Sequence, residues 1–302
     1  MDNAIEWPKK TREIQFWAMD STYWNEFKFR DDDIVIATYA KAGTTWLQQI
    51  IAQFIFNGET DHLPIGDISA WLDFRLPPLE AKLPGIEAQE HRRFLKTHLP
   101  VDALVFSPMA KYIYIARDGR DVVWSMYSHH SYLNDMFYDA LNALPDFGPA
   151  IERPTTSDLR EYFLNWLDKE GHPFWPFWEN IRSWWDIRDL PNVHFLHYQN
   201  LKDDMEGEMR RIAEFLEIPV DETKWEQMVE NCTFEHMKHN SPLVAPLGGA
   251  IFDGGTEVFI YKGTNKRWRD TLTNEDVAAY EARARNELGE DCAHWLETGH
   301  FK

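Results

Sequence analysis

Residues 40–46 (AKAGTTW) form a segment whose residue types and spacing suit the binding of an anion. They follow residues 34–39 (IVIATY), an apolar run that predicts a buried strand, and residues 44–57 then place apolar side chains on one helical face. A strand, a glycine-containing turn and a helix expose unpaired N–H groups at the positive end of the helix dipole. Because Lys41 adds a cation and the two threonines add hydroxyl donors, the segment predicts a site for a phosphate-like group.

This segment is not a Walker A loop, because that motif requires a lysine after its last glycine and directly before a serine or threonine. Here Lys41 precedes Gly43, the only glycine of the segment. Taken alone, the segment also permits another interpretation, an ordinary strand–helix turn in which Lys41 is merely solvated.

Two further side chains stand where predicted strands end. His98 comes just after the short run RRFLK, and Arg117 directly follows residues 111–116 (KYIYIA). Parallel α/β sheets bind ligands at the carboxyl ends of their strands. A histidine there can take a proton from a hydroxyl, and the planar fork of an arginine can bind two phosphate oxygens. The competing interpretations are a structural histidine and a simple Arg117–Asp121 pair.

The elements that must position these side chains alternate between strands and helices. A further strand is expected over 192–198. Asp118 is expected to cap the helix that follows the strand at 111–116. Further helices are expected over 158–170, 175–188, 204–216 and 275–288, and a long loop over 238–262. The alternation predicts an α/β fold: a single domain over residues 1–302, with a central, mostly parallel sheet flanked by helices and a P-loop-like phosphate site.

These motifs, in this order, resemble those of the cytosolic-type sulfotransferases, which use 3'-phosphoadenosine 5'-phosphosulfate (PAPS). YAKAGTTW resembles the family's 5'-phosphosulfate loop, YPKSGTTW, and departs from it only at Ala40 and Ala42. Residues 96–100 (KTHLP) are identical to the family's catalytic segment. The alanine at position 42 removes one hydroxyl near the phosphosulfate, so we expect somewhat weaker binding there. The resemblance spans about residues 34–273.

Two segments resemble the family's 3'-phosphate site. In the family an arginine ends a strand and a serine follows on the next helix, and Arg117 and Ser125 occupy those positions. Lys262 and Gly263 match the start of the family's RKGxxGDWK signature, whereas Tyr261 replaces its first arginine. One cation is therefore missing from the implied phosphate site, and a single charge-assisted contact contributes roughly 1.5–3 kcal/mol.

The resemblance also implies the remaining binding residues. Trp46 is expected to stack on the adenine and Tyr198 to hydrogen-bond it. The full set implied for the nucleotide is Lys41, Ala42, Gly43, Thr44, Thr45, Trp46, Arg117, Ser125, Tyr198, Cys232, Thr233, Phe234, Lys262 and Gly263. The set implied for the acceptor is Phe16 or Trp17, Trp71, Phe74, His98, His129 and Phe174. For Trp71 and Phe74, a role in the hydrophobic core is the competing interpretation.

The reaction that the resemblance implies is in-line sulfuryl transfer to a hydroxyl or amine of a small, apolar or aromatic acceptor. His98 would act as general base, Lys41 and Lys96 would stabilise the developing charge, and Ser125 would restrain Lys41 until the acceptor arrives. PAPS would be the cosubstrate and 3',5'-diphosphoadenosine (PAP) the product, with no metal required.

Composition limits the partners and the location. With 31 basic and 50 acidic residues, the net charge of −19 argues against binding to nucleic acid or to an anionic membrane. Two cysteines form no disulfide framework, the N-terminus has no apolar signal core, and no apolar run reaches about 18 residues. We therefore expect a cytoplasmic protein. The family's C-terminal dimer signature is poorly kept, so a monomer and a homodimer are both open.

Three other functions compete with this interpretation. A nucleotide or small-molecule kinase would share the strand–loop–helix site but would require magnesium. A non-catalytic relative would bind the nucleotide without turnover, against which the intact Lys41, Lys96 and His98 argue. Sulfation of large carbohydrates is disfavoured by the acidic composition, since sulfated glycans are held by basic clefts.

Overall fold

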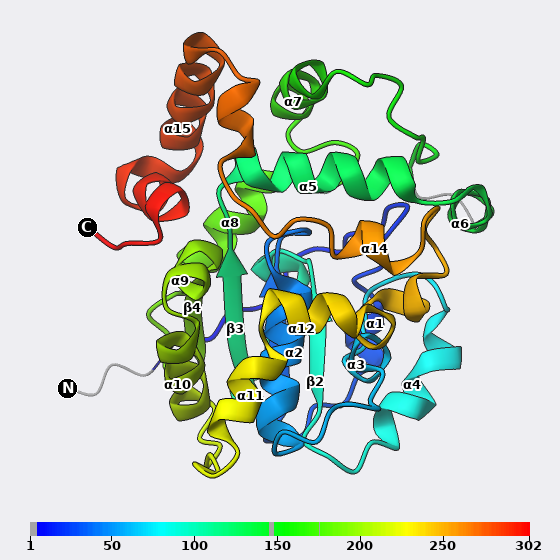
Figure 1. Ribbon diagram of the computed structural model, residues 1–302, viewed down its shortest axis with the longest axis vertical. Coiled ribbons are helices and arrows are strands. Elements are labelled where there is room, and N and C mark those ends of the chain that lie inside the picture. Colours follow the sequence, from blue (N-terminus) through cyan, green and yellow to red (C-terminus); the bar gives the residue numbers. More distant parts are fainter. Residues whose placement is uncertain (1–4, 145–147, 175) are drawn as a thin grey trace.

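A four-stranded parallel sheet forms the centre of the computed structural model, which describes residues 5–144, 148–174 and 176–302. The strand order is β2–β1–β3–β4, and every neighbouring pair is parallel. The strands are β1 (Ile34–Thr38), β2 (Phe94–Thr97), β3 (Lys111–Ala116) and β4 (Val193–His197). Helices flank the sheet (Figure 1), so the α/β fold class predicted from the sequence is confirmed.

The pairing register brings the carboxyl ends of all four strands to one edge of the sheet. Ala37 of β1 pairs with Thr97 of β2 and with Tyr114 of β3, and Ala116 of β3 pairs with His197 of β4. In Figure 1 this edge faces α5 and α14. The segments that leave the four strands there are the loop 39–43, His98, Arg117 and Tyr198.

One face of the sheet packs against three helices: α2 (Thr44–Ile55), α10 (Met205–Phe215) and α11 (Trp225–Asn231). Side chains alternate between the two faces of a strand, so Ile34 and Ile36 share this face. They belong to one buried cluster with Ile50 of α2 and Ile212 of α10. Because α2 starts directly after the loop 39–43, its burial fixes the position of that loop.

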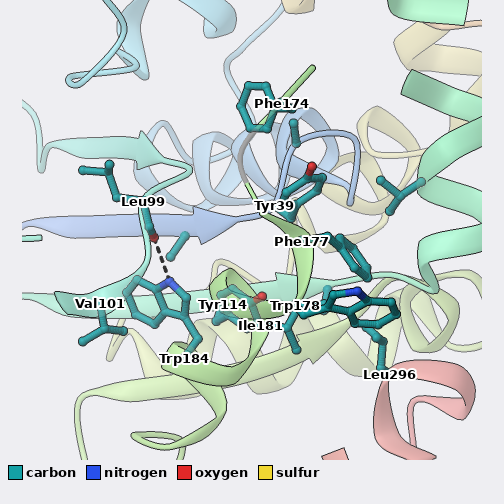
Figure 2. Packing of buried hydrophobic residues seen from close by; sticks show 14 of the residues in the cluster. Tyr39, Leu99, Val101, Tyr114, Phe174, Phe177, Trp178, Ile181, Trp184 and Leu296 are labelled. Carbon is teal, nitrogen blue, oxygen red and sulfur yellow. Dashed lines mark hydrogen bonds between the residues drawn. The ribbon is translucent and has the colours of Figure 1, made fainter. Parts of the chain in front are cut away.

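The opposite face packs against α8 (Phe177–Trp185), with α15 (Asn274–Thr298) packed on α8, while α5 (Gly119–Tyr132) crosses the carboxyl edge. Figure 2 shows the aromatic packing there: Tyr114 of β3 stacks on Trp184 of α8, with ring centroids 5.4 Å apart. The Trp184 Nε1–H donates to the carbonyl oxygen of Leu99 at 3.0 Å. This bond fixes the chain just after His98, so α8 supports the edge where the site is built.

Most predicted elements lie close to their expected bounds, and Asp118 caps α5 as expected, its side chain accepting from the backbone N–H of Arg120. The last helix was expected to end near residue 288 but continues to Thr298 across a break at Gly289. The remaining helices are α1 (Tyr23–Glu26), α3 (Ile65–Ile68), α4 (Leu79–Glu87), η1 (Val101–Ala103), α6 (Asp135–Asn142), α7 (Leu159–Asp168), α9 (Tyr198–Asp203), α12 (Phe234–His239), α13 (Ser241–Val244), η2 (Pro246–Gly249), α14 (Thr256–Phe259) and η3 (Arg267–Asp270).

The expectation of a loop over 238–262 is wrong in detail. The segment contains α13, η2 and α14, with positive φ at Leu247, Gly248 and Gly249 inside η2 and at Gly254 and Gly255 before α14. Each piece spans one helical turn, too short for a periodic apolar pattern to appear in the sequence. In the described part of the chain, no helix combines the length and apolar character needed to cross a membrane.

Candidate active site

The loop 39–43 joins β1 to α2 in a conformation that demands glycine at one position. Gly43 has φ 117°, in the left-handed region. A Cβ at Gly43 would also lie 2.9 Å from Ile115 Cδ1 and 2.9 Å from Tyr198 Cδ2, closer than carbon atoms approach without displacement. Gly43 therefore permits both the turn and the close approach of β3 and α9 to the loop.

The first turn of α2 supplies the donors expected of an anion site. Its N-cap is Gly43, which has no side chain to cap the first N–H groups. Gly43, Thr44, Thr45 and Trp46 all line one large cavity at the carboxyl edge of the sheet. The helix therefore presents its positive end to that cavity.

Lys41 extends from the loop into the same cavity. Its Nζ lies 3.2 Å from Nδ1 of His129 on α5 and 4.9 Å from the ring centre of Phe259. Burial, followed by the charges of Arg117 and Lys96, lowers the pKa of Lys41 to about 7. The restraint on Lys41 was expected from Ser125, but the hydrogen bond observed is to His129, one turn further along α5. Burial and the Lys41 charge hold the pKa of His129 well below its usual range, so the neutral imidazole acts as the acceptor.

His98 follows β2, and its contacts fix its tautomer. Nδ1 lies 2.8 Å from the carbonyl oxygen of Thr38, an atom that can only accept a hydrogen bond. The proton of the neutral ring is therefore on Nδ1, which leaves Nε2 able to accept another. Burial and the neighbouring charges of Lys96 and Lys41 lower the pKa of His98 to about 3. The ring is thus held neutral, as a general base requires.

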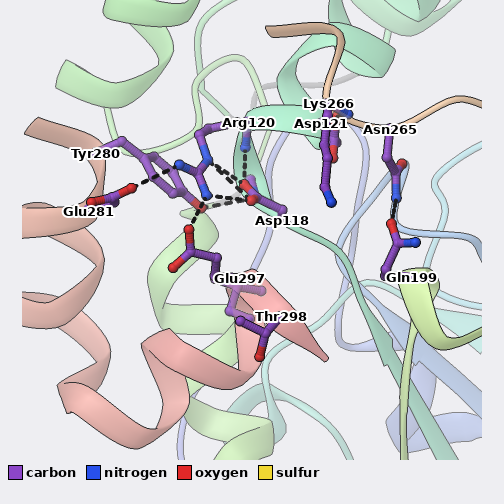
Figure 3. Close-up of polar contacts among 12 residues, drawn as sticks. Asp118, Arg120, Asp121, Gln199, Asn265, Lys266, Tyr280, Glu281, Glu297 and Thr298 are labelled. Atoms are coloured by element: carbon purple, nitrogen blue, oxygen red, sulfur yellow. Dashed lines mark hydrogen bonds and ion pairs between the residues drawn. The ribbon is translucent and has the colours of Figure 1, made fainter. Parts of the chain in front are cut away.

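Arg117 follows β3 and is hydrogen-bonded to a turn near the end of the chain. Its Nε and Nη2 donate to the side-chain oxygen of Asn265 at 3.0 and 2.6 Å. Asn265 in turn donates to the side chain of Gln199 at 2.8 Å (Figure 3). Asp121 accepts instead from the backbone N–H of Lys266 at 2.6 Å. In the described residues, the hydrogen bonds of Arg117 therefore go to this turn and to the carbonyl oxygen of Lys41 at 3.4 Å, rather than to Asp121.

The wall beside Arg117 contains the other residues expected at the 3'-phosphate. Ser125 of α5, Lys262 and Gly263 all line the cavity. A Cβ at Gly263 would lie 2.6 Å from Phe234 Cδ2, so this position is closely packed as well. The carbonyl oxygen of Gly263 accepts from Nζ of Lys202 at 2.6 Å. Lys202 therefore adds a cation to this wall.

The residues expected around the adenine are brought together beside α2. Trp46 and Tyr198 meet edge to face with centroids 5.5 Å apart, and Trp46 Nε1 donates to the carbonyl oxygen of Cys232 at 2.8 Å. The side chain of Thr233 caps α12. Phe234 alone of residues 232–234 lines the cavity, whereas Cys232 and Thr233 support the wall from behind.

Aromatic side chains form the other end of the cavity. Trp71 stacks on Phe74 at 4.5 Å and meets His98 edge to face at 4.7 Å. Phe174 lies 5.7 Å from His98. Trp71 and Phe74 line the cavity, so they are not confined to the core. Trp17 lines it too, whereas Phe16, the alternative at this place, does not.

The cavity has a volume of about 990 Å³ and joins the two ends of the site. The expected residues outside its lining are Phe16, Ala42, Cys232 and Thr233. Those that line it are Lys41, Gly43, Thr44, Thr45, Trp46, Trp71, Phe74, Lys96, His98, Arg117, Ser125, His129, Phe174, Tyr198, Phe234, Lys262 and Gly263.

Several lining or contacting residues were not identified from the sequence. Asn265 lies two positions after Gly263, and this proximity to the motif was the only signal for it. Lys202 and Phe259 carry no motif. Lys82 lines the cavity and donates to the carbonyl oxygens of Trp71 and Phe74, and nothing in the residues around it marks that contact.

A parallel sheet with a cationic strand–loop–helix site and an apolar pocket at the same edge defines a phosphate-binding α/β protein. Residues 31–291 match the family model described as the sulfotransferase domain. The chain therefore belongs to the sulfotransferase family and is an enzyme of that class.

Similar proteins cover most of the chain. The glycolipid sulfotransferase of Mycobacterium bovis (strain BCG) is 27% identical over 93% of this chain and 92% of its own length. Human sulfotransferase 1C2 is 30% identical, covering 82% of this chain and 80% of the relative, and mouse sulfotransferase 1B1 is 31% identical, covering 89% and 87%. Mouse sulfotransferase SULT7A1 complexed with PAP shares the fold with a TM-score of 0.67 at 20% identity, covering 90% of each chain. Retinol dehydratase with androsterone and PAP does so with a TM-score of 0.69 at 23% identity, covering 90% and 87%.

Proposed function

We propose that this chain transfers a sulfuryl group from PAPS to a hydroxyl or amine of a small, apolar or aromatic acceptor. One observation carries the proposal: Lys41, His98 and Arg117 each follow a different strand and line the same cavity. Membership of the sulfotransferase family supports the reaction type. The solved structures of mouse SULT7A1 and retinol dehydratase hold PAP, which supports the nucleotide.

The donor groups fit a nucleotide with phosphates at two separate places. Two nitrogens of Arg117 already converge on one oxygen of Asn265, so the guanidinium is oriented for an oxygen acceptor there. Ser125 and Lys262 line the same wall and suit a 3'-phosphate. The N–H groups of the first turn of α2, with Lys41, suit the phosphosulfate. Trp46 and Tyr198 lie between them and suit the adenine.

In this reaction the acceptor oxygen forms a bond to sulfur while the bond from sulfur to the bridging phosphate oxygen breaks. The electron pair of the broken bond stays on the phosphate of PAP, and the acceptor proton passes to Nε2 of His98. The Thr38 carbonyl keeps the other ring proton on Nδ1, so the base presents one tautomer. General base catalysis of this kind contributes about 10²- to 10⁴-fold.

Lys41 and Lys96 stabilise the charge that develops on the sulfuryl group and on the leaving oxygen. Burial lowers the pKa of Lys96 to about 8, while nearby Asp73 and Asp67 oppose that shift. The positive charges of Lys96 and Lys41 help to lower the pKa of His98. A bound phosphosulfate offsets those charges, so we expect nucleotide binding to raise the pKa of His98 towards neutrality, where a base works best.

The acceptor end of the cavity favours a molecule with a large apolar part. Its walls include Trp17, Trp71, Phe74 and Phe174, and the polar groups near the reacting end are His98 and His129. The mycobacterial relatives are named glycolipid sulfotransferases, and the retinol dehydratase structure holds androsterone. Both support an acceptor with a substantial apolar framework.

The test is calorimetric titration with PAP, with 5'-AMP and with ATP plus magnesium, followed by sulfation assays on phenols and alcohols. We expect tight, metal-independent binding of PAP that requires the 3'-phosphate. His98→Ala should abolish turnover and leave PAP affinity nearly unchanged, whereas His62→Ala, at an exposed histidine, should leave both intact. A preference for ATP with magnesium would point to a kinase, and PAP binding without turnover on any acceptor would point to a non-catalytic relative.

We also propose that residues 1–302 form one sulfotransferase domain in the cytoplasm, with a small-molecule acceptor and no nucleic-acid or membrane partner. The family match ends at residue 291, but Trp295 and Leu296 belong to the same buried cluster as Ile14 and Trp24 near the other end of the chain. This shared core supports a single unit. Light scattering on the purified protein distinguishes a monomer from a homodimer.

A further inference from the structure

Asp73 is a buried carboxylate that lies just outside the cavity and has no role in the reaction described above. Its Oδ2 accepts from Trp24 Nε1 at 2.7 Å and from the Thr97 hydroxyl at 2.6 Å. Its Oδ1 accepts from Trp71 Nε1 at 2.5 Å. Asp73 is fully buried, so an ionised carboxylate there depends on these donors and on nearby cations. Three side-chain donors on one buried carboxylate form a specific polar cluster.

Two of these donors, Trp71 and Thr97, lie beside the residues of the reacting end of the site. Trp71 meets the His98 ring edge to face at 4.7 Å, and its own ring lies 5.7 Å from Nζ of Lys96. Thr97 is the residue between Lys96 and His98. The indole N–H is the only polar group of the Trp71 side chain, so the bond to Asp73 determines how the ring faces His98. Asp73 thus orients both the wall beside the base and the segment that carries it.

The charges around Asp73 agree with this role. Burial raises the pKa of Asp73, and the bonds from Thr97, Trp24 and Trp71 and the charge of Lys82 oppose the rise. The negative charge in turn favours the protonated form of Lys96, as does that of Asp67. An ionised Asp73 therefore helps to keep Lys96 cationic beside the transferring group.

We propose that Asp73 is a positioning residue for sulfuryl transfer, which holds the indole of Trp71 against His98 so that the acceptor hydroxyl meets the base. This inference rests on the proposed function, because the reaction supplies the need for that orientation. The hydrogen-bond donors to the Asp73 carboxylate are Trp24, Trp71 and Thr97, none of them in the set implied for the nucleotide, so its effect should fall on the acceptor step. A purely structural carboxylate would instead lower stability without altering kinetics selectively.

The experiment compares three variants of the full chain: Asp73→Asn, Trp71→Phe and Trp24→Phe. Trp71→Phe keeps an aromatic wall but removes the N–H that Asp73 holds. Trp24→Phe is the matched control, since it removes a hydrogen bond to the same carboxylate without touching Trp71. We expect Asp73→Asn and Trp71→Phe to lower kcat at least tenfold while PAP affinity changes less than twofold. Trp24→Phe should keep kcat within about twofold of the original at a temperature where all variants remain folded.

The double variant Asp73→Asn/Trp71→Phe should be no slower than Trp71→Phe alone, since both changes remove the same contact. Equal losses of kcat in Asp73→Asn and Trp24→Phe, or an unchanged kcat in Trp71→Phe, would overturn the proposal. Crystal structures of Asp73→Asn and of the unaltered protein give a readout that does not depend on turnover. A displaced Trp71 ring supports the proposal and an unmoved ring refutes it, whereas failure of the unaltered chain to bind PAP would refute the proposed function instead.

Discussion

The side-chain oxygen of Asn265 accepts two hydrogen bonds from Arg117, in the place where the proposed 3'-phosphate would require the same donors. Nucleotide binding must therefore break these bonds. We predict that Asn265→Ala raises PAP affinity at least about tenfold, since a hydrogen bond to a charged group contributes roughly 1.5–3 kcal/mol. Affinity for 5'-AMP, which lacks the 3'-phosphate, should not change.

Calorimetric titration of both nucleotides against both proteins measures this effect. Gln199→Ala is the matched control, because Gln199 accepts from the amide nitrogen of Asn265, whereas Arg117 donates to its oxygen. If Asn265→Ala binds PAP more weakly, Asn265 is a contact of the nucleotide itself rather than its competitor.

Lys41 leads to a second prediction at the scale of single residues, the pH dependence of PAP binding. Its pKa in the free protein is lowered to about 7, chiefly by burial, and a bound anion must raise it. Binding is therefore strongest below pH 7, where Lys41 is already protonated, and it weakens as the pH rises above 7. One linked proton gives at most about a tenfold loss per pH unit.

Titrations at pH 6.5, 7.5 and 8.5, each in two buffers with different ionisation enthalpies, count the protons taken up. Lys41→Arg should bind PAP with little pH dependence, because an arginine stays charged over this range. Proton release on binding, or an affinity that rises with pH in the unaltered protein, would contradict the prediction.

Residues that follow strands could be placed at the cavity from the sequence, whereas the residues that meet them across the fold could not. Lys41, His98 and Arg117 could be found because strand ends converge in a parallel sheet whatever the details of packing. The contacts of Lys41 with His129 and of Arg117 with Asn265 depend on how α5 and the 264–265 turn pack over that edge. Neither of those packings follows from local pattern, so the partners were not predicted.

At the scale of elements, sequence patterns predict the long elements but not the short ones. The three predicted strands and α2 have apolar runs that dictate their type. The segment 238–262 lacks such a run, and its single-turn helices are held by tertiary contacts, such as the bond from Ser241 to Thr256 at 2.7 Å. The break in α15 at Gly289, with φ 76°, likewise lies in a polar stretch whose pattern predicts only where the helix begins.

Arg120 joins the start of α5 to α15 and provides a prediction about these elements. Its guanidinium is buried and forms ion pairs with Asp118, Glu281 and Glu297 at 2.7, 3.3 and 3.0 Å (Figure 3). Removing one partner of a buried pair leaves an unpaired charge, which costs about 3–5 kcal/mol. We predict a loss of this size in the free energy of unfolding for Arg120→Met, measured by urea denaturation.

The matched control for Arg120→Met is Arg153→Met, because Arg153 also pairs with carboxylates, Asp135 and Asp253, but at the surface. Exposed pairs contribute at most about 1 kcal/mol, so this variant should be nearly as stable as the unaltered protein. Equal stability of the two variants would show that the Arg120 cluster does not hold α15 to α5.

At the scale of the whole molecule, the net charge of −19 coexists with an anion site because the cations are gathered at one edge. Lys41, Lys96, Arg117, Lys202 and Lys262 all line the cavity. Net charge describes the average surface but not this local clustering of cations. The short-range interactions of the clustered cations outweigh a screened global field. The position of the cavity therefore follows from topology and could not follow from charge counts.

Buried histidines make the stability of the whole fold depend on pH. Burial is the main cause that lowers the pKa of His98 to about 3, of His130 to about 3 and of His197 to about 4. In the unfolded chain a histidine has a pKa of about 6.5. Below that pH the unfolded chain binds more protons than the folded one, so stability falls as the pH drops. Each histidine contributes about 1.4 kcal/mol per pH unit until its folded pKa is reached.

Asp121 has the opposite effect on stability, because burial raises its pKa to about 6. Between about pH 4 and 6 the folded chain therefore binds more protons at this carboxyl than the unfolded chain does. His129, whose pKa is also held low, adds to the effect of these three histidines, and together they outweigh this one carboxyl. We therefore predict a loss of several kcal/mol in the free energy of unfolding between pH 7 and 5. Urea denaturation at pH 7, 6 and 5 measures it. His130→Phe should make the slope shallower without abolishing it, and equal stability at pH 7 and 5 would show that these histidines take up protons without unfolding the chain.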